Sequence, residues 1–325
     1  MAKTLTVSIA AYNVEGYLDT ALKSIAKAKL RDDVEVLVID DGATDGTLKI
    51  AEKYEKHYPG VFFAVHKANG GYGSTVDWAI QNARGKYIKL LDGDDWFDSE
   101  ALDSMIVRMK QSTADVFVSN VVEFHEDNGE KIEKYPFLRN VDEGEWMLDS
   151  IADKPAVAMW GFAFSTKIAK KTAVQLPKYS LYTDQLFVVH CLREAKSFEA
   201  IPVPVYYWRI GREEQSNNIK SISKHADDVI NVARNINDYY IANAKTAKSS
   251  YFLKRVGAYY SVSIAMLCMI KKSHAMYRTI RVWDKFVKKN QLEVYRESQQ
   301  SKKCYCLEQR PIKHTGLSET GGYSK

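Results

Sequence analysis

The chain has 325 residues, of which 46% are hydrophobic and 27% charged, and its formal net charge is +5. This composition is typical of a soluble globular protein and excludes an intrinsically disordered chain. The four cysteines form no disulfide pattern, and the strand-like run at the N-terminus predicts no signal peptide. The longest charge-free apolar stretch, residues 256–270, is too short for an ordinary transmembrane helix. We therefore expect a cytoplasmic protein.

The charge is distributed unevenly along the chain. Residues 1–219 carry 26 Lys and Arg against 33 Asp and Glu, a net charge of −7. Residues 220–325 carry 20 against 8, a net charge of +12, and the two parts sum to +5. The basic C-terminal part favours an anionic partner, and a membrane surface or an anionic polymer explains it as well as nucleic acid does.

Strand-like and helix-like segments alternate through the first 126 residues. Continuous apolar runs predict strands, and apolar residues at helical spacing predict the helices between them. The expected strands are residues 5–12, 34–41, 61–67, 88–91 and 114–126, and the expected helices are residues 14–28, 44–58 and 75–83. This alternation predicts an α/β fold with a largely parallel sheet covered by helices on both faces.

After residue 220 the pattern predicts helices at residues 226–244, 251–272 and 276–290. We expect three domains or segments: an α/β domain at 1–219 with halves at about 1–125 and 126–219, a helical domain at 220–300, and a flexible polar tail at 301–325. The helix at 251–272 is apolar in its middle and basic at both ends. It is interpreted as a membrane-surface element, as a platform for oligomerisation or acceptor binding, or as a helix buried against the rest of the chain.

The most informative motif is an acidic cluster directly after an apolar strand. Asp92, Asp94 and Asp95 follow residues 88–91, at the edge where open α/β sheets bind ligands. Neighbouring carboxylates repel one another unless a cation lies among them, and oxygen ligands without a nearby His or Cys favour Mg²⁺ or Mn²⁺ over Zn²⁺. The alternative is a solvated acidic turn with Gly93 as its turn residue.

Three further loops follow expected strands, at residues 11–13, 40–47 and 69–74. Tyr12 offers an aromatic face, Asp41 offers a hydrogen-bond acceptor, and the glycines allow the backbone to approach a ligand. Together the loops suit a nucleoside diphosphate, with a base to stack and phosphates to bridge through a cation. Each loop alone is also compatible with ordinary turn or helix-cap chemistry.

Two common nucleotide-binding motifs do not occur in the sequence. No GxGxxG follows the first strand, and GxxxxGK[ST] is found nowhere. We therefore expect the phosphate charge to be met chiefly by a metal ion.

The motifs SIAAYN, VIDDGATDGT, NGGYGS and YIKLLDGDDWF resemble those of family 2 glycosyltransferases, inverting enzymes with the GT-A fold. The resemblance covers residues 5–218 and implies a GT-A doubly wound mixed sheet, followed here by a helical region. The nucleotide-sugar site that it implies comprises Ala10, Tyr12, Asn13, Asp41, Asn69, Ser74, Asp92, Gly93, Asp94, Asp95 and Arg209.

The resemblance also implies roles within that site. Tyr12 would stack on the base, and Asp41 would accept from its imide N–H. Asp92 and Asp94 match the family's DXD pair and would hold Mn²⁺ or Mg²⁺, with Asp94 the more direct ligand. Asp95 would help to hold the sugar or the metal.

Inverting transfer also needs a base that removes the proton of the acceptor hydroxyl. Asp184, in the segment LYTDQLF, resembles the base in the family's E-D-x-x-F motif, although a helix N-cap is the alternative role. Thr183 stands where the family has an acidic residue, and Ala10 and Ala11 stand where it usually has a Pro before Tyr-Asn.

Aromatic and basic residues in the second half are further candidates. The residues expected to line the site are Tyr206, Tyr207 and Arg209, with Arg209 or Arg212 in contact with the pyrophosphate. The alternative is a core strand followed by an exposed loop. Trp160 is expected to stack on a sugar face or to pack in the core.

These residues and the family resemblance together predict a metal-dependent inverting glycosyltransferase that moves a sugar from a UDP-sugar to a glycan or lipid-linked acceptor. The resemblance alone implies a role in bacterial cell-surface polysaccharide synthesis. We expect no nucleic-acid partner, while a membrane surface at the inner face of the plasma membrane and a homo-oligomer are open hypotheses. Two alternatives remain. A non-catalytic nucleotide- or glycan-binding module could dispense with Asp184, and a sugar-nucleotide pyrophosphorylase would need a Gly-rich basic loop after the first strand, which residues 10–16 lack.

Overall fold

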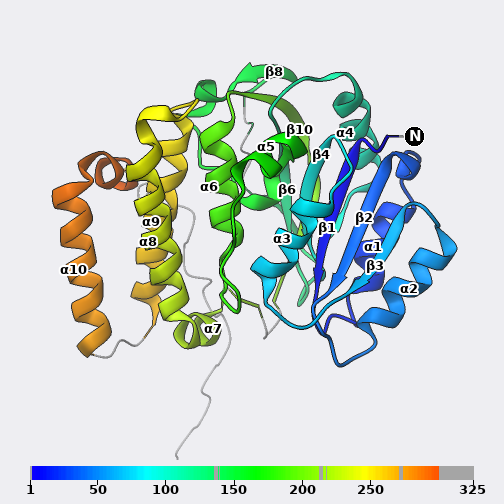
Figure 1. Cartoon of the computed structure of the whole chain (residues 1–325), viewed down its shortest axis with the longest axis horizontal. Coiled ribbons are helices and arrows are strands. Elements are labelled where there is room, and N and C mark those ends of the chain that lie inside the picture. Colours follow the sequence, from blue (N-terminus) through cyan, green and yellow to red (C-terminus); the bar gives the residue numbers. More distant parts are fainter. Residues whose placement is uncertain are drawn as a thin grey trace, which may run out of the picture.

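A computed structural model describes residues 2–134, 138, 140–211, 215–216, 218–270 and 274–299 (Figure 1). Its centre is a single mixed β-sheet with the strand order β3-β2-β1-β4-β9-β6-β10-β5, to which β7 adds beside β6 and β8 beside β10. The strands are β1 (Leu5–Ala11), β2 (Val34–Asp40), β3 (Phe62–His66), β4 (Tyr87–Asp92), β5 (Trp96–Phe97), β6 (Val116–His125), β7 (Lys131–Lys134), β8 (Gly144–Met147), β9 (Phe162–Ser165) and β10 (Ser197–Ile210). The predicted tail at 301–325 lies outside the described residues, as does Arg212.

The first four strands form the parallel half of the sheet that the sequence predicts. Leu5 of β1 pairs in register with Val34 of β2 on one side and with Tyr87 of β4 on the other. β1 and β2 are buried along nearly their whole length, which explains their continuous apolar character. Because these strands are parallel, the loops that follow them meet at one edge of the sheet.

The second half of the sheet is mixed, so the expectation of a largely parallel sheet holds only for the first half. β9 runs antiparallel between β4 and β6, and β6 is parallel to β10. Pro202 and Pro204 lie in β10 where its pairing with β6 shifts register, because proline cannot donate to the ladder. After this irregularity, β10 continues to Arg209 and Ile210 at the same edge as the loops of the first half.

Helices cover both faces of the sheet (Figure 1). They are α1 (Leu18–Ala26), α2 (Thr47–His57), α3 (Tyr72–Asn82), α4 (Ser99–Gln111), α5 (Thr166–Thr172), α6 (Asp184–Glu194), α7 (Ile219–Lys224), α8 (Ala226–Asn243), α9 (Tyr251–Met269) and α10 (His274–Asn290). α1 packs against α2 and α4, whereas α3, α5 and α6 pack against one another on the other face. The predicted helices are therefore confirmed, with ends that differ by a few residues.

The C-terminal helices share their core with the α/β part. α8 and α9 pack on α6, and Ile236, Tyr251 and Val256 belong to the same buried cluster as the sheet. Of the three interpretations of the helix at 251–272, the structure supports the buried one, since Lys254 and Arg255 are only 9% and 5% exposed. No helix in the described part of the chain is long and apolar enough to cross a membrane.

Candidate active site

Asp41, which follows β2, holds the loop that precedes α3. Its carboxylate accepts hydrogen bonds from the backbone N–H groups of Gly70 (2.9 Å) and Gly71 (2.7 Å) and from Lys67 Nζ. Asn69 Nδ2 donates to the backbone oxygen of Asp41 at 2.9 Å. Asp41 is 3% exposed and already accepts from three donors of this loop. A hydrogen bond from the imide N–H of a nucleobase to Asp41 therefore stays a prediction.

Lys67 is a cation in this loop cluster that the sequence analysis did not single out. Besides Asp41, its Nζ donates to Ser74 Oγ at 2.8 Å and to the backbone oxygen of Ala68 at 3.0 Å. Lys67 directly follows the apolar run of β3 and precedes the glycine-rich loop. This position in the sequence is the signal that could have indicated a role in the site. Ser74 is thus placed within the cluster, as expected.

The first loop presents Tyr12 at the end of β1, where its side chain is 51% exposed. Asn13 adopts a positive φ of 52°, and its Oδ1 accepts the backbone N–H of Thr44 at 2.8 Å, which ties the first two loops together. Gly93 packs on the same strand end: a Cβ added there would lie 2.9 Å from the backbone oxygen of Ala10. Only glycine allows this approach, so it fixes the acidic loop beside β1.

Asp95 lies beneath the acidic loop. Its carboxylate accepts the hydroxyl of Tyr206 (2.6 Å) and the backbone N–H of Arg209 (2.8 Å), and Asp95 is 1% exposed. Burial, followed by the charges of Asp94 and Asp92, raises the pKa of Asp95 well above its usual value. This geometry supports a role in positioning the loop rather than the predicted direct contact with sugar or metal.

Arg209 also supports the acidic loop from below. Its Nε donates to the backbone oxygen of Asp94 at 2.8 Å, and its Nη1 pairs with Glu126 at 2.9 Å. The guanidinium carbon lies 5.1 Å from the ring centroid of Tyr17 and 4.9 Å from that of Trp96. Arg209 is therefore committed to holding the loop, and the predicted contact with the pyrophosphate stays a prediction.

Asp92 and Asp94 are both partly exposed at the sheet edge. Among the described residues, no group of three or more His, Cys, Asp or Glu side chains is arranged to hold a metal ion. Two carboxylates nevertheless fit Mg²⁺ or Mn²⁺, because such an ion commonly keeps water ligands and takes substrate phosphates as the others. The residues present thus fit the expected metal together with its substrate.

Asp184 is the first residue of α6, and Thr183 occupies the N-cap position. Burial raises the pKa of Asp184 to about 6, while Arg255 and the side chain of Gln185 oppose this shift. Gln185 Nε2 donates a hydrogen bond to Asp184 Oδ2. A carboxylate with a pKa near 6 is ionised at neutral pH and is a stronger base than an ordinary Asp.

Tyr72 is the first residue of α3, and its hydroxyl donates to Sδ of Met159 at 3.5 Å. Burial, followed by the charges of Asp92 and Asp184 and a hydrogen bond with Asp92, raises the pKa of Tyr72 well above its usual value. Asp92 and Asp184 therefore both lie close enough to this phenol to affect its ionisation. Tyr72 lies inside the quoted NGGYGS motif, but sequence reasoning assigned it no role.

The loop that leads to Asp184 packs directly on the glycine-rich loop. The backbone N–H of Tyr179 donates to Gly70 O at 2.9 Å, and its hydroxyl donates to Asn69 O at 3.0 Å. Gly71 has a φ of +79°, and a Cβ there would lie 2.8 Å from the backbone nitrogen of Tyr179. These glycines thus join the two halves of the site, which their sequence pattern alone did not indicate.

The family model for glycosyl transferase family 2 matches residues 6–171, which is more than half of the chain. The chain belongs to this family. The resemblance that the four loop motifs carry is thereby confirmed.

Curated relatives of this family 2 chain come from bacteria. EpsH of Bacillus subtilis is 25% identical over 219 residues, which are 63% of this chain and 60% of EpsH. The poly(ribitol-phosphate) beta-glucosyltransferase of Bacillus spizizenii is 25% identical over 220 residues, 66% of this chain and 33% of that protein. TarS of Staphylococcus aureus, a poly(ribitol-phosphate) beta-N-acetylglucosaminyltransferase, is 25% identical over 210 residues, 64% of this chain and 36% of TarS. The chain thus spans 60% or less of the length of these three relatives.

Solved structures resemble the fold. S. aureus TarS residues 1–349 in complex with UDP-GlcNAc superposes with a TM-score of 0.62 at 21% identity, covering 79% of this chain and 72% of that one. The mannosyltransferase PcManGT from Pyrobaculum calidifontis, in complex with GDP-Man and Mn²⁺, gives a TM-score of 0.53 at 15% identity and covers 94% of this chain and 87% of that one. The predicted GT-A fold with a C-terminal helical region is thereby confirmed.

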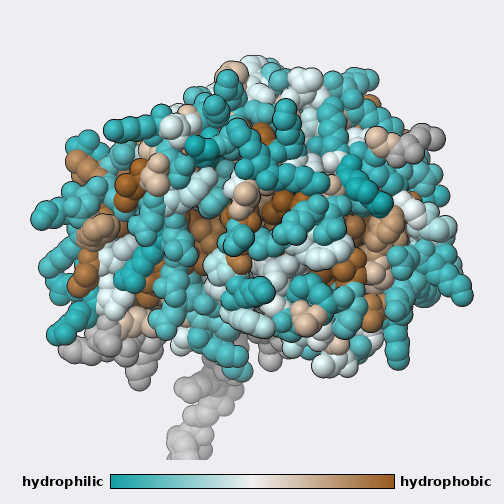
Figure 2. Space-filling view, in the orientation of Figure 1, coloured by the Kyte–Doolittle hydropathy of each residue, from teal (hydrophilic) through white to brown (hydrophobic). Residues whose placement is uncertain are grey.

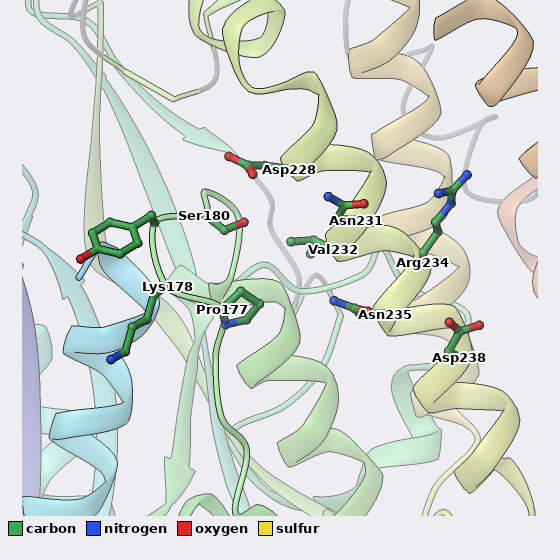
Figure 3. Close-up of a pocket in the computed structure, with 10 residues that line it drawn as sticks. Pro177, Lys178, Ser180, Asp228, Asn231, Val232, Arg234, Asn235 and Asp238 are labelled. Atoms are coloured by element: carbon green, nitrogen blue, oxygen red, sulfur yellow. The ribbon is translucent and has the colours of Figure 1, made fainter. Parts of the chain in front are cut away.

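A cavity of about 530 Å³ opens in this family 2 fold between the loop before Asp184 and α8 (Figure 3). Its lining is mostly polar and consists of Pro177, Lys178, Tyr179, Ser180, Asp228, Asn231, Val232, Arg234, Asn235 and Asp238. Asn231, Val232 and Asn235 project from α8 toward the loop in Figure 3. Asp228 Oδ2 accepts the backbone N–H of Leu181 at 3.3 Å, so one end of the cavity lies close to the start of α6.

The remaining aromatic candidates are engaged in packing. Tyr206 is fully buried, so the core-strand alternative fits it. Tyr207 stacks on Trp96 with ring centroids 5.4 Å apart, and Trp160 stacks on Trp208 at 4.0 Å. A contact of Trp160 or Tyr207 with a sugar stays a prediction.

Proposed function

We propose that this chain is a metal-dependent inverting glycosyltransferase that transfers a sugar from a UDP-sugar to a hydroxyl of a glycan or lipid-linked acceptor. The observation that carries this proposal is the contact between the loop before Asp184 and the glycine-rich loop, in which the backbone N–H of Tyr179 donates to Gly70 O at 2.9 Å. The charges of Asp92 and Asp184 also both act on Tyr72 at the start of α3. These observations indicate that a leaving-group site and a base occupy one edge of the sheet. The complex of TarS with UDP-GlcNAc supports UDP as the nucleotide.

The residues of the site would divide the chemistry among them. Asp184, whose pKa is about 6, would take the proton of the acceptor hydroxyl. The acceptor oxygen would then bond to the anomeric carbon from the face opposite the diphosphate. The bond from this carbon to the diphosphate breaks, the diphosphate leaves with its electrons, and the configuration of the carbon is inverted. Bound Mn²⁺ or Mg²⁺, held by Asp92 and Asp94, would supply positive charge to the diphosphate leaving group.

The nucleobase of the sugar donor would stack on the exposed ring of Tyr12. A half-exposed aromatic side chain at a strand end offers a flat apolar face at low conformational cost. Asp41 donates its backbone N–H to Ala11 O, directly before Tyr12, at 2.9 Å, and its carboxylate accepts from Lys67 and Gly70. The Mn²⁺ in the structure of PcManGT supports a divalent cation in this kind of fold.

The cavity beside α8 is the proposed place of the acceptor. Amide and carboxylate side chains of Asp228, Asn231 and Asn235 can bond the hydroxyl groups of a saccharide or polyol chain, and Lys178 and Arg234 can attract phosphate groups. The names of the two poly(ribitol-phosphate) relatives support such an acceptor. A role in bacterial cell-surface polysaccharide synthesis follows as part of this proposal.

Contact with a membrane surface stays part of the proposal, but α10 suits it better than α9. Tyr277, Val282 and Phe286 are exposed large hydrophobic side chains of α10. They alternate with Arg281 and Lys285, which fits a helix that lies on an anionic lipid surface. Figure 2 shows hydrophobic side chains exposed on this helix.

Release of UDP from a panel of UDP-sugars, measured with Mn²⁺ and without acceptor, tests the proposed function. We expect slow hydrolysis of one donor that stops when EDTA removes the metal. If UDP binds but no UDP-sugar is hydrolysed and no acceptor is glycosylated, a non-catalytic binding module is the better account. Release of pyrophosphate when the protein is given a sugar phosphate and a nucleoside triphosphate would instead indicate a pyrophosphorylase.

A further inference from the structure

A buried arginine of the C-terminal helices reaches the residue proposed as the base. Arg255 lies on α9, is 5% exposed, and donates from Nη2 to Gln185 Oε1. Gln185 in turn donates from Nε2 to Asp184 Oδ2. One side chain therefore connects a helix of the C-terminal region with the carboxylate of Asp184.

The chemistry of arginine decides how the amide of Gln185 is oriented. A guanidinium group has donors and no acceptor, so only the oxygen end of the amide can face Arg255. The NH₂ end must then face Asp184, which as a carboxylate only accepts. If the amide were turned around, its oxygen would oppose the carboxylate and its NH₂ would oppose the guanidinium. Arg255 thus selects the orientation in which Gln185 donates to Asp184.

The helix that carries Arg255 is anchored one turn earlier. Tyr251 is fully buried, and its hydroxyl accepts the backbone N–H of Val157 at 3.0 Å. The start of α9 is also tied to Asp149, whose Oδ1 accepts Ser250 Oγ at 2.8 Å. These contacts hold the first turns of α9 against the α/β part, so that Arg255 has a fixed position.

We propose that Arg255 is a positioning residue for Asp184, which through Gln185 holds Oδ2 of the carboxylate and places a buried positive charge near it. This inference rests on the proposed function, in which Asp184 is the base. It gives the C-terminal helices a part in the reaction besides covering α6.

The other groups that face Asp184 do not replace this charge. Tyr72 approaches from α3, Tyr182 from the preceding loop and Tyr259 from α9, and all three phenols have a raised pKa, so they are neutral at physiological pH. The charge of Asp228, on α8, adds to the effect of burial in raising the pKa values of Tyr182 and Tyr259. Burial is the largest cause of the raised pKa of Asp184, and the charge of Arg255 is the largest cause that opposes it. Removal of Arg255 therefore raises the pKa of Asp184 further.

The experiment titrates Asp184 in the full-length protein without ligand. Aspartate labelled with ¹³C at Cγ is followed by NMR between pH 4 and 9, and the resonance of Asp184 is the one that Asp184→Asn removes. We expect Arg255→Met to raise the pKa of Asp184 by about one unit, which corresponds to a roughly tenfold lower ionised fraction at low pH. Arg255→Lys retains the charge and is expected to stay closer to the wild type.

Two further variants keep the test decisive. Gln185→Leu removes the hydrogen bond while Arg255 remains, and it should also raise the pKa of Asp184, so it gives the answer if Arg255→Met does not fold. Lys254→Met is the matched control, because Lys254 is a buried cation of the same helix that pairs with Glu297 at 3.3 Å. It should leave the titration of Asp184 unchanged.

The two possible failures are distinguishable. If Arg255→Met and Gln185→Leu both leave the titration of Asp184 as in the wild type, Arg255 is a structural residue only and the inference is overturned, even if both variants melt earlier. The NMR titration needs no sugar donor. If the pKa of Asp184 moves as expected while Asp184→Asn retains transfer activity, the positioning of Asp184 by Arg255 is supported and the proposed function fails.

Discussion

The hydroxyl group of Tyr206 donates a hydrogen bond of 2.6 Å to Oδ2 of Asp95. The same hydroxyl accepts the backbone N–H of Asp92 at 3.2 Å, so one phenol on β10 holds two residues of the acidic loop. Since Tyr206 is fully buried, these contacts fix the loop from inside the protein.

We expect Tyr206→Phe to weaken metal-dependent UDP binding as well as stability. The change removes the donor of Asp95 Oδ2, while the backbone N–H of Arg209 still donates to Oδ1. Loss of this buried hydrogen bond costs about 1–3 kcal/mol of folding free energy. Tyr87→Phe is the matched control, because the hydroxyl of Tyr87 is also buried but bonds Ala114 O (3.0 Å) at the other end of β4. Calorimetry with UDP and Mn²⁺ should show weaker binding for Tyr206→Phe alone, and equal affinities in both variants would refute the positioning role.

Replacing Asp94 with Asn should remove the metal dependence of UDP binding. The substitution takes away a charged oxygen ligand but keeps the size of the side chain. We expect wild-type affinity for UDP to fall on addition of EDTA, and the affinity of the variant to be low with or without it. Asp32→Asn, at the opposite edge of the sheet, serves as the control for loss of one negative charge. A variant that still responds to Mn²⁺ like the wild type would argue against Asp94 as a ligand.

Activity should depend on the ionisation of Asp184. Because its pKa is about 6 and the base must be ionised, the rate should rise with pH through about 6 and reach about one tenth of its plateau at pH 5. The free energy of unfolding depends on pH in the opposite direction. Because burial raises the pKa of Asp184, the folded state binds this proton more tightly than the unfolded chain does. The contribution of Asp184 to stability is therefore lost as pH rises from about 4 to 6. A pH–rate profile of donor hydrolysis whose acid limb lies near pH 4 would contradict this assignment.

The cavity beside α8 should influence the acceptor and not the donor. Asn235→Ala removes one polar side chain that projects into it, and we expect a severalfold higher KM for a soluble glycan or polyol-phosphate acceptor. Acceptor-independent hydrolysis of the UDP-sugar should stay unchanged. Asn243→Ala, at the end of the same helix, is the control. An unchanged acceptor KM in Asn235→Ala would place the acceptor elsewhere.

The sequence predicted the first half of the fold well because its strands are buried on both faces and therefore read as continuous apolar runs. It also located the four loops, since parallel strands bring their ends to one edge. The antiparallel β9 was missed because four residues give too short a pattern to recognise.

The site was predicted less completely, since several of its contacts join distant parts of the chain. Asp95 and Arg209 belong to recognisable motifs, but only the structure shows that they support the loop from below. Arg255 lies in an apolar helix whose basic ends indicated a solvated or membrane-facing surface. Its contact with Gln185 has no local sequence signal, because it depends on how α9 packs on α6.

The most direct test of the account is a comparison of Asp184→Asn with the wild type for sugar transfer and for UDP binding in the presence of Mn²⁺. The account predicts that the rate of transfer falls by roughly 100- to 10,000-fold, because the base is lost, while the affinity for UDP stays nearly the same. Transfer at the wild-type rate by Asp184→Asn would contradict it.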